Sequence, residues 1–250
     1  MAKTAPLDWP LAPIAHRGLH DLSRGIVENS PTAVVAARDH GFGIEVDLQL
    51  SRDGAALVFH DFTLDRLTGE TGPVRERAAS ELAAVAYSDG QDRVMRFDAL
   101  LDLVGGAVPL YVELKSDHGR NATLVNAIVP AVTAYRGPLA VMSFDPFLVA
   151  RVQDALPDTP VGLVSGRFDS PTWDPHVRSW STRFALRHML SVPLLRPAFV
   201  NYDISAIGAF APQWLRRRGM PLLTWTVRTP THRADAERLA DAMVFEGFVP

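Results

Sequence analysis

Short apolar runs of four to seven residues alternate along the chain with longer segments of helical period. This alternation predicts a parallel sheet whose strands are joined by crossover helices. The expected strands lie at residues 13–16, 43–48, 109–113, 139–142, 160–164, 198–201, 221–227 and 242–245. The expected helices lie at residues 31–40, 97–104, 122–135, 146–156, 184–190, 212–218 and 231–240.

Three helices have clear start signals. Ser30-Pro31, Asp145-Pro146 and Thr229-Pro230 each place a capping residue before a proline. A proline fits the first helical turn because its missing N–H has no partner there. These pairs therefore predict where the helices begin.

Eight strands with interleaved helices favour a (β/α)8 TIM barrel, an α/β fold, over an open doubly wound sheet. No G-x-G-x-x-G follows the first strand, which removes the usual dinucleotide signature. The 250 residues match the size of one barrel, so we expect a single domain over residues 1–250. Two connections, residues 49–96 and 165–183, are long enough to carry function.

Glu45 and Asp47 stand two residues apart in an otherwise apolar strand. Strand side chains alternate faces, so both carboxylates point the same way, roughly 6–7 Å apart along the strand. Two like charges in a buried setting repel and lose hydration unless a cation lies between them. A divalent metal site is therefore the first hypothesis.

Other polar residues follow expected strands at their carboxyl ends, where barrel enzymes have their active sites. His16 and Arg17 end the first strand, and Glu113 and Lys115 repeat the two-residue spacing on the third. Glu45, Asp47 and Glu113, as candidate metal ligands, supply only oxygen atoms. Oxygen suits Mg²⁺ or Ca²⁺, with Mn²⁺ as a further choice, rather than zinc.

His16 and His60 each end a β-like run beside these acids, which suggests a general acid/base pair. Asp61 is expected to orient His60. Arg17 and Lys115 add donors suited to a phosphate. The combination of metal, imidazoles and cations is typical of phosphoryl-ester chemistry.

Trp225 on the seventh strand has two interpretations. It can form an apolar wall for substrate at the mouth, or pack as a core residue beneath the loops. Glu28 and Asn29, in the loop after the first strand, are expected to play a supporting role.

Charge and composition give no reason to expect nucleic-acid or membrane partners, and they exclude cysteine chemistry. The formal net charge is −3, with 25 basic and 28 acidic residues, so nothing favours nucleic acid or an anionic membrane. There is no cysteine, which excludes disulfides and thiolate metal sites. Because no signal-type or membrane-spanning apolar stretch is found, we expect a soluble, cytoplasmic protein without membrane insertion.

Taken together, the motifs resemble the glycerophosphodiester phosphodiesterase family in order and spacing. They are His16-Arg17-Gly18, Glu28-Asn29-Ser30, Ile44-Glu45-Val46-Asp47, Asp53-Gly54, His60-Asp61, Arg66-Leu67-Thr68-Gly69, Glu113-Leu114-Lys115, Ser143-Phe144 and Trp225-Thr226. The resemblance implies a (β/α)8 barrel that hydrolyses glycerophosphodiesters to an alcohol and glycerol 3-phosphate. It also implies that Glu45, Asp47 and Glu113 are metal ligands, and that His16 and His60 are the acid and base. Residues 62–108 resemble the family's small helical insertion.

The chain departs from the family pattern near its end, where Phe245-Glu246-Gly247 replaces the common Thr-Asp-x-Pro. No eighth outer helix is expected before Pro250, which leaves part of the barrel wall to the N-terminal segment or to another subunit of a homo-oligomer. Val27 also replaces the usual proline before Glu28.

Two other functions compete with this hypothesis. A related barrel phosphodiesterase could act on lysophospholipids if residues 165–197 lined an apolar channel. The side chains available for it are Phe168, Trp173, Trp180, Phe184, Met189 and Leu190. A non-catalytic phosphate-binding barrel is disfavoured because every acid, base and ligand position is filled.

Overall fold

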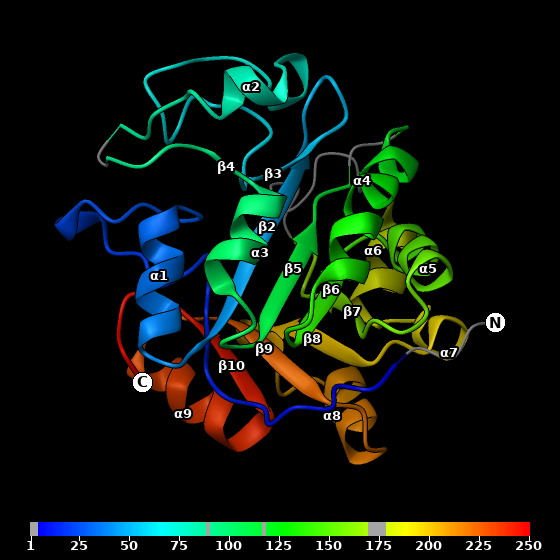
Figure 1. Ribbon diagram of the computed structural model, residues 1–250. Helices are drawn as coiled ribbons and strands as arrows, with labels where there is room; N and C mark the ends of the chain where they lie inside the picture. Colours follow the sequence, from blue (N-terminus) through cyan, green and yellow to red (C-terminus); the bar gives the residue numbers. More distant parts are fainter. Residues whose placement is uncertain (1–4, 89–90, 117–118, 170–178) are drawn as a thin grey trace.

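Eight parallel strands close into a barrel in the computed structural model, which describes residues 5–88, 91–116, 119–169 and 179–250 (Figure 1). Around the barrel the strands are β1 (Ile14–Ala15), β2 (Gly43–Leu50), β5 (Leu110–Leu114), β6 (Leu139–Ser143), β7 (Val161–Ser165), β8 (Phe199–Asp203), β9 (Leu222–Val227) and β10 (Ala242–Phe245). Strand β1 pairs with both β10 and β2, which closes the circle. The predicted (β/α)8 barrel is confirmed.

Helices surround this barrel. They are α1 (Pro31–Asp39), α3 (Phe97–Val104), α4 (Asn121–Ala134), α5 (Pro146–Ala155), α6 (Trp180–Arg187), α7 (Val192–Leu195), α8 (Phe210–Arg217) and α9 (Pro230–Leu239). Short 3-10 helices η1 (Leu22–Arg24) and η3 (Ile204–Ala206) lie in the loops.

The three predicted helix starts are confirmed. The side chains of Ser30, Asp145 and Thr229 each accept a hydrogen bond from a backbone N–H in the first turn of α1, α5 and α9. The helix expected at residues 184–190 was misplaced, because α6 begins at Trp180 and ends before Met189. Met189 adopts a left-handed backbone conformation with φ of 52°, which the α-helix cannot continue.

Strand side chains alternate between the inside of the barrel and its outer face. Inside lie Ile14, Tyr111, Ala140, Met142, Val164, Phe199, Leu223 and Val244. The intervening positions on β2 and β5, such as Val46 and Val112, pack outward in the larger core that includes the helices. Burial on both faces explains why these strands are mostly apolar, apart from the inward-facing polar residues of the site.

After β2 the chain makes an excursion before it returns to the barrel. β3 (Ala56–Val58) pairs antiparallel with β2, and β4 (Met95–Arg96) with β3. Between them lie η2 (Val74–Glu76) and α2 (Ala79–Leu82), over a small core that includes Leu57, Phe59 and Tyr87. Helix α3 also lies within residues 62–108, but it packs against α1 in the outer ring of helices. Residues 62–108 therefore contain both this excursion and one barrel helix.

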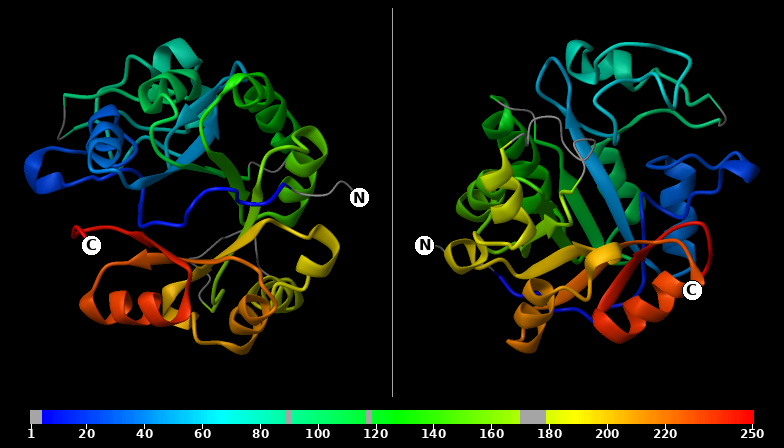
Figure 2. Two further views of the ribbon diagram at one scale, coloured as in Figure 1. Left: turned by 60° about the horizontal axis from the view of Figure 1, so that its bottom comes forward. Right: turned by 180° about the vertical axis from the view of Figure 1, so that it is seen from behind.

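The N-terminal segment runs across the opening at the amino-terminal ends of the strands (Figure 2). Leu7, Trp9 and Leu11 pack against the interior cluster, and the Trp9 indole N–H donates to the Tyr111 hydroxyl at 3.0 Å. The segment therefore closes the bottom of the barrel, whereas the sequence left part of the wall to this segment or to another subunit.

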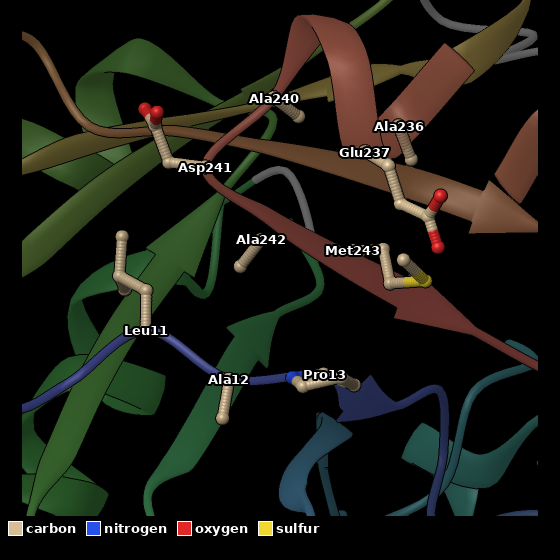
Figure 3. A pocket seen from close by; sticks show the side chains of 9 residues that line it. All are labelled: Leu11, Ala12, Pro13, Ala236, Glu237, Ala240, Asp241, Ala242 and Met243. Carbon is tan, nitrogen blue, oxygen red and sulfur yellow. The ribbon is translucent and has the colours of Figure 1, made fainter. Parts of the chain in front are cut away.

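No helix follows β10 among the described residues up to Pro250. Aromatic rings pack there instead: Phe248 lies 5.5 Å from Phe245, and Phe245 lies 5.1 Å from Phe42, between ring centroids. A shallow pocket lies beside this region, between residues 11–13 and the α9–β10 segment (Figure 3). Its lining includes Glu237 and Asp241, away from the carboxyl ends of the strands.

Within the described residues, no helix combines the length and the apolar character required to cross a lipid bilayer.

Candidate active site

The carboxyl ends of β1, β2 and β5 bring the expected acidic and basic residues together. Asp47 lies directly beside Glu113 in the β2–β5 register, and Glu45 lies beside the inward-facing Tyr111. The expectation that Glu45 and Asp47 share a face is therefore confirmed, and that face is the barrel interior.

Glu45, Asp47 and Glu113 form an acidic triad. One carboxylate oxygen from each lies within 4.8 Å of the others, and the residues are only 2%, 1% and 7% exposed. Burial, followed by the charges of Asp47 and Glu113, raises the pKa of Glu45 well above its ordinary value. Three buried oxygen donors at this spacing suit a hard divalent cation.

Lys115 supplies positive charge to the triad. Its ammonium donates to Asp47 Oδ1 at 2.7 Å and to Glu113. Burial alone would raise the pKa of Asp47, but Lys115, His60 and Arg17 together hold it well below its ordinary value. Lys115 and Arg17 carry two positive charges beside three carboxylates, and a bound cation would offset the repulsion from Asp47 and Glu113 that contributes to the raised pKa of Glu45.

Arg17 connects the first loop to the triad. Its backbone N–H donates to Glu45 at 3.0 Å, its guanidinium donates to Glu28 at 2.6 Å, and Nε lies 3.4 Å from Asp47. Arg17 adopts a left-handed conformation with φ of 56°, a strained backbone that aims this N–H at Glu45. Gly18 follows with φ of 78°, where a Cβ would lie 2.8 Å from the Ala33 backbone.

Asn29 holds Asp47 from the same loop. Its amide donates to Asp47 Oδ2 at 2.9 Å, and its carbonyl oxygen accepts from the Asp47 backbone N–H at 3.3 Å. Glu28 contacts both Arg17 and Arg66. These contacts agree with the supporting role expected for Glu28 and Asn29.

His16 is paired with a carboxylate that sequence reasoning did not include in the site. Its Nδ1 contacts Glu246 Oε2, and its Nε2 lies 3.9 Å from Glu45. Burial is the main cause that lowers the pKa of His16 to about 4. Glu246 directly follows β10, so the strand-end criterion applied to the other strands would have found it.

His60 belongs to a second imidazole–carboxylate pair. Its Nδ1 lies 2.6 Å from Asp61 Oδ1, as expected from the His60-Asp61 motif. Arg66 bonds Asp61 at 2.6 Å and Glu28 at 2.7 Å, and so links this pair to the first loop. Sequence reasoning quoted Arg66 only as part of a motif, because nothing local shows which acids it reaches.

Trp225 lies on the other half of the mouth, among aromatic side chains from β6, β7 and β9. Its ring is 5.3 Å from Phe144, which is 6.2 Å from Phe168. The Trp225 indole donates to the Ser165 carbonyl at 3.3 Å. The mouth therefore has a charged half around β10, β1, β2 and β5 and an aromatic half opposite.

A closed barrel with buried acids, cations and two carboxylate-paired imidazoles at its mouth defines a class of protein: a barrel hydrolase built for metal-assisted acid–base chemistry on an anionic ester. The chain belongs to the Glycerophosphoryl diester phosphodiesterase family, whose profile matches residues 16–247.

One curated relative matches nearly the whole chain. A glycerophosphodiester phosphodiesterase of Caldanaerobacter subterraneus subsp. tengcongensis is 26% identical over 241 residues, which cover 92% of this chain and 90% of that protein.

Solved structures show the same fold. A phosphodiesterase of Oleispira antarctica, in complex with the product sn-glycerol-3-phosphate, has a TM-score of 0.76 at 21% identity and covers 94% of this chain and 92% of its own. A glycerophosphodiester phosphodiesterase of Thermotoga maritima has a TM-score of 0.70 at 23% identity, with 95% and 94% covered.

Proposed function

We propose that this chain hydrolyses glycerophosphodiesters to an alcohol and sn-glycerol 3-phosphate. The observation that carries the proposal is the acidic triad, which lies at the barrel mouth between two imidazole–carboxylate pairs and two cations. Family membership supports it, and so does the product bound to the Oleispira antarctica relative.

Glu45, Asp47 and Glu113 would hold the divalent metal, Mg²⁺ or Ca²⁺, with Mn²⁺ as a further choice. When bound, it would polarise a phosphoryl oxygen and offset developing negative charge. The metal add-back experiment tests which of these ions supports hydrolysis.

Arg17 and Lys115 bind the phosphate in this proposal. Both cations already lie against the triad, so they face the same space as its oxygens. Their donors neutralise the phosphoryl charge that increases in the transition state.

His16 and His60 move the protons. One imidazole takes a proton from the nucleophile while the other protonates the leaving alkoxide. Each ring has its Nδ1 engaged by a carboxylate, Glu246 or Asp61, which orients the ring and leaves Nε2 for the reaction.

Trp225 contributes an apolar surface for glycerol carbons or for the alcohol group. Its aromatic neighbours Phe144 and Phe168 keep its ring in place. This role rests on the position of the ring opposite the charged half.

The lysophospholipid alternative receives less support. Of the side chains considered for an acyl channel, Trp180 and Phe184 stack on each other on α6 and are 78% and 45% exposed, whereas Phe168 and Met189 are buried. Trp173 lies outside the described residues. A small polar headgroup therefore fits better than an acyl chain.

A substrate panel with chelator and metal add-back tests the proposal. Purified protein is incubated with glycerophosphocholine, glycerophosphoethanolamine or lysophosphatidylcholine, and released alcohol and glycerol 3-phosphate are measured. We expect glycerophosphodiester hydrolysis that stops with chelator and returns with Mg²⁺, Ca²⁺ or Mn²⁺. Glu113→Gln should abolish it, while Glu237→Gln, on α9, should not.

Two results would contradict the proposal. Preference for lysophosphatidylcholine would favour the alternative, and no hydrolysis with any metal would favour a binding barrel.

The domain organisation, the cellular location and the oligomeric state are further parts of this proposal. We propose that residues 1–250 act as one phosphodiesterase domain, located in the cytoplasm. Self-association into a homo-oligomer is a prediction that size-exclusion chromatography with light scattering tests.

A further inference from the structure

A second cluster of potential ligands lies beside the acidic triad. It consists of His16 at the end of β1, His20 in the following loop, and Glu246 at the end of β10. One ligand atom from each lies within 4.8 Å of the others. We propose that this cluster binds Zn²⁺ or a similar borderline transition-metal ion. The bound ion inhibits the enzyme because His16 becomes one of its ligands.

The three atoms converge on a small volume. Glu246 Oε2 contacts His16 Nδ1 and lies 3.6 Å from His20 Nε2. The His20 Nε2 atom is buried, and at 3.6 Å from Glu246 Oε2 it has no partner at hydrogen-bond distance within the described part of the chain. A buried imidazole nitrogen without a partner loses its hydration, and a metal ion at this position would satisfy it.

The donor types distinguish this cluster from the triad. Two imidazole nitrogens and one carboxylate oxygen are a zinc-type set, whereas the triad offers oxygen only. Glu246 Oε1 contacts Arg228, so the carboxylate is anchored while its other oxygen faces the histidines.

Inhibition follows from the identity of the shared residue and rests on the proposed function. A metal held at Nδ1 of His16 replaces the Glu246 contact that orients this ring, and it changes the basicity of Nε2. Because Mg²⁺ prefers oxygen ligands, an excess of Mg²⁺ should not relieve the inhibition.

Direct binding tests the site without reference to turnover. Zn²⁺ is titrated calorimetrically, and Co²⁺ by its visible absorption, into folded protein saturated with Mg²⁺. We expect His20→Gln to weaken Zn²⁺ binding by roughly tenfold or more. His40→Gln, at the C-cap of α1, is the matched control and should bind like the wild type.

A second variant separates the two sites. Glu113→Gln disables the triad and should retain the Zn²⁺ affinity of the wild type. Unchanged Zn²⁺ binding in His20→Gln, or loss of binding in Glu113→Gln, would overturn the proposal.

The kinetic consequence is measured separately. We expect His20→Gln to require roughly tenfold more Zn²⁺ for half-inhibition of glycerophosphocholine hydrolysis, with each protein compared with its own zinc-free rate. Equal Zn²⁺ sensitivity of both proteins would refute the inhibitory role. If no substrate were turned over, the binding titrations would still decide whether the site exists.

Discussion

Imidazole–carboxylate contacts are the clearest feature of this site at the scale of single residues. His16 contacts Glu246, and His60 contacts Asp61. Burial would raise the pKa of Glu246 and of Asp61, but their histidine and arginine contacts hold both well below the ordinary value. Both carboxylates are therefore ionised at neutral pH and able to orient their imidazoles.

Replacing either histidine tests the proposed acid and base. We expect His16→Ala and His60→Ala each to lower kcat by about 10²–10⁴-fold, because general acid–base catalysis contributes that much. Steady-state hydrolysis of glycerophosphocholine measures the effect, with His40→Ala as control. Near-normal turnover in both site variants would show that other groups move the protons.

Tyr87 gives a prediction for stability. Its hydroxyl is buried without a hydrogen-bond partner in the described chain, and burial, then the charges of Glu28 and Asp92, raises its pKa far above the ordinary value. Above about pH 10 the unfolded chain loses the phenolic proton while the folded chain keeps it, so the free energy of unfolding falls as pH rises.

Tyr87→Phe should reduce that alkaline loss and should stabilise the protein by about 1 kcal/mol near pH 8, since no polar group is left unpaired. Urea denaturation of both proteins, at about pH 8 and about pH 11, measures the difference. An equal loss of stability in the two proteins would mean that Tyr87 is not protected by the fold.

Single residues also show the limits of sequence reasoning. The shared face of Glu45 and Asp47 was predictable because strand geometry has a period of two. The contacts of Arg66 with Glu28 and Asp61 were not, because a long side chain can reach several acids and no local pattern shows which ones it contacts.

At the scale of elements, neighbouring strands must fit each other inside the barrel. Gly162 on β7 lies beside Phe199 on β8, and a Cβ at Gly162 would lie 2.3 Å from the Phe199 ring. Phe199 is fully buried, so its ring has no free space in which to move.

Gly162→Ala should therefore destabilise the protein by about 1–3 kcal/mol through overpacking. Gly69→Ala is the control, because a Cβ there meets nothing within 4 Å. Thermal or urea unfolding measures both variants. A neutral Gly162→Ala would mean that the Phe199 ring can shift.

The positions of helices and strands were the most predictable feature of this structure. Capping residues with prolines defined the starts of α1, α5 and α9, because such signals act within one helical turn. The end of α6 was missed, because the hydrophobic pattern does not show that Met189 adopts a left-handed conformation.

For the whole molecule, the acidic triad links metal binding to folding. The triad exists only when β2 and β5 are paired, so a metal that binds it stabilises the folded chain over the unfolded one. At a free metal concentration 100 times Kd, this linkage is about 2.7 kcal/mol.

We expect Mg²⁺ or Ca²⁺ to raise the Tm of the wild type relative to chelator, and Glu113→Gln to remove most of that shift. Differential scanning calorimetry with and without metal measures it, with Glu237→Gln as the matched control. A metal-dependent Tm shift of wild-type size in Glu113→Gln would place the ion elsewhere.

The sequence by itself determined the eight barrel strands, the starts of α1, α5 and α9, the barrel class and the shared face of Glu45 and Asp47, because those features depend on short-range periodicity and capping. Only the tertiary structure decided that Glu246 contacts His16, that Arg66 joins the two halves of the polar network, and that the N-terminal segment closes the bottom of the barrel. Most of these contacts join residues far apart along the chain, and the contact of Glu246 with His16 exists only after the barrel closes and brings β10 against β1.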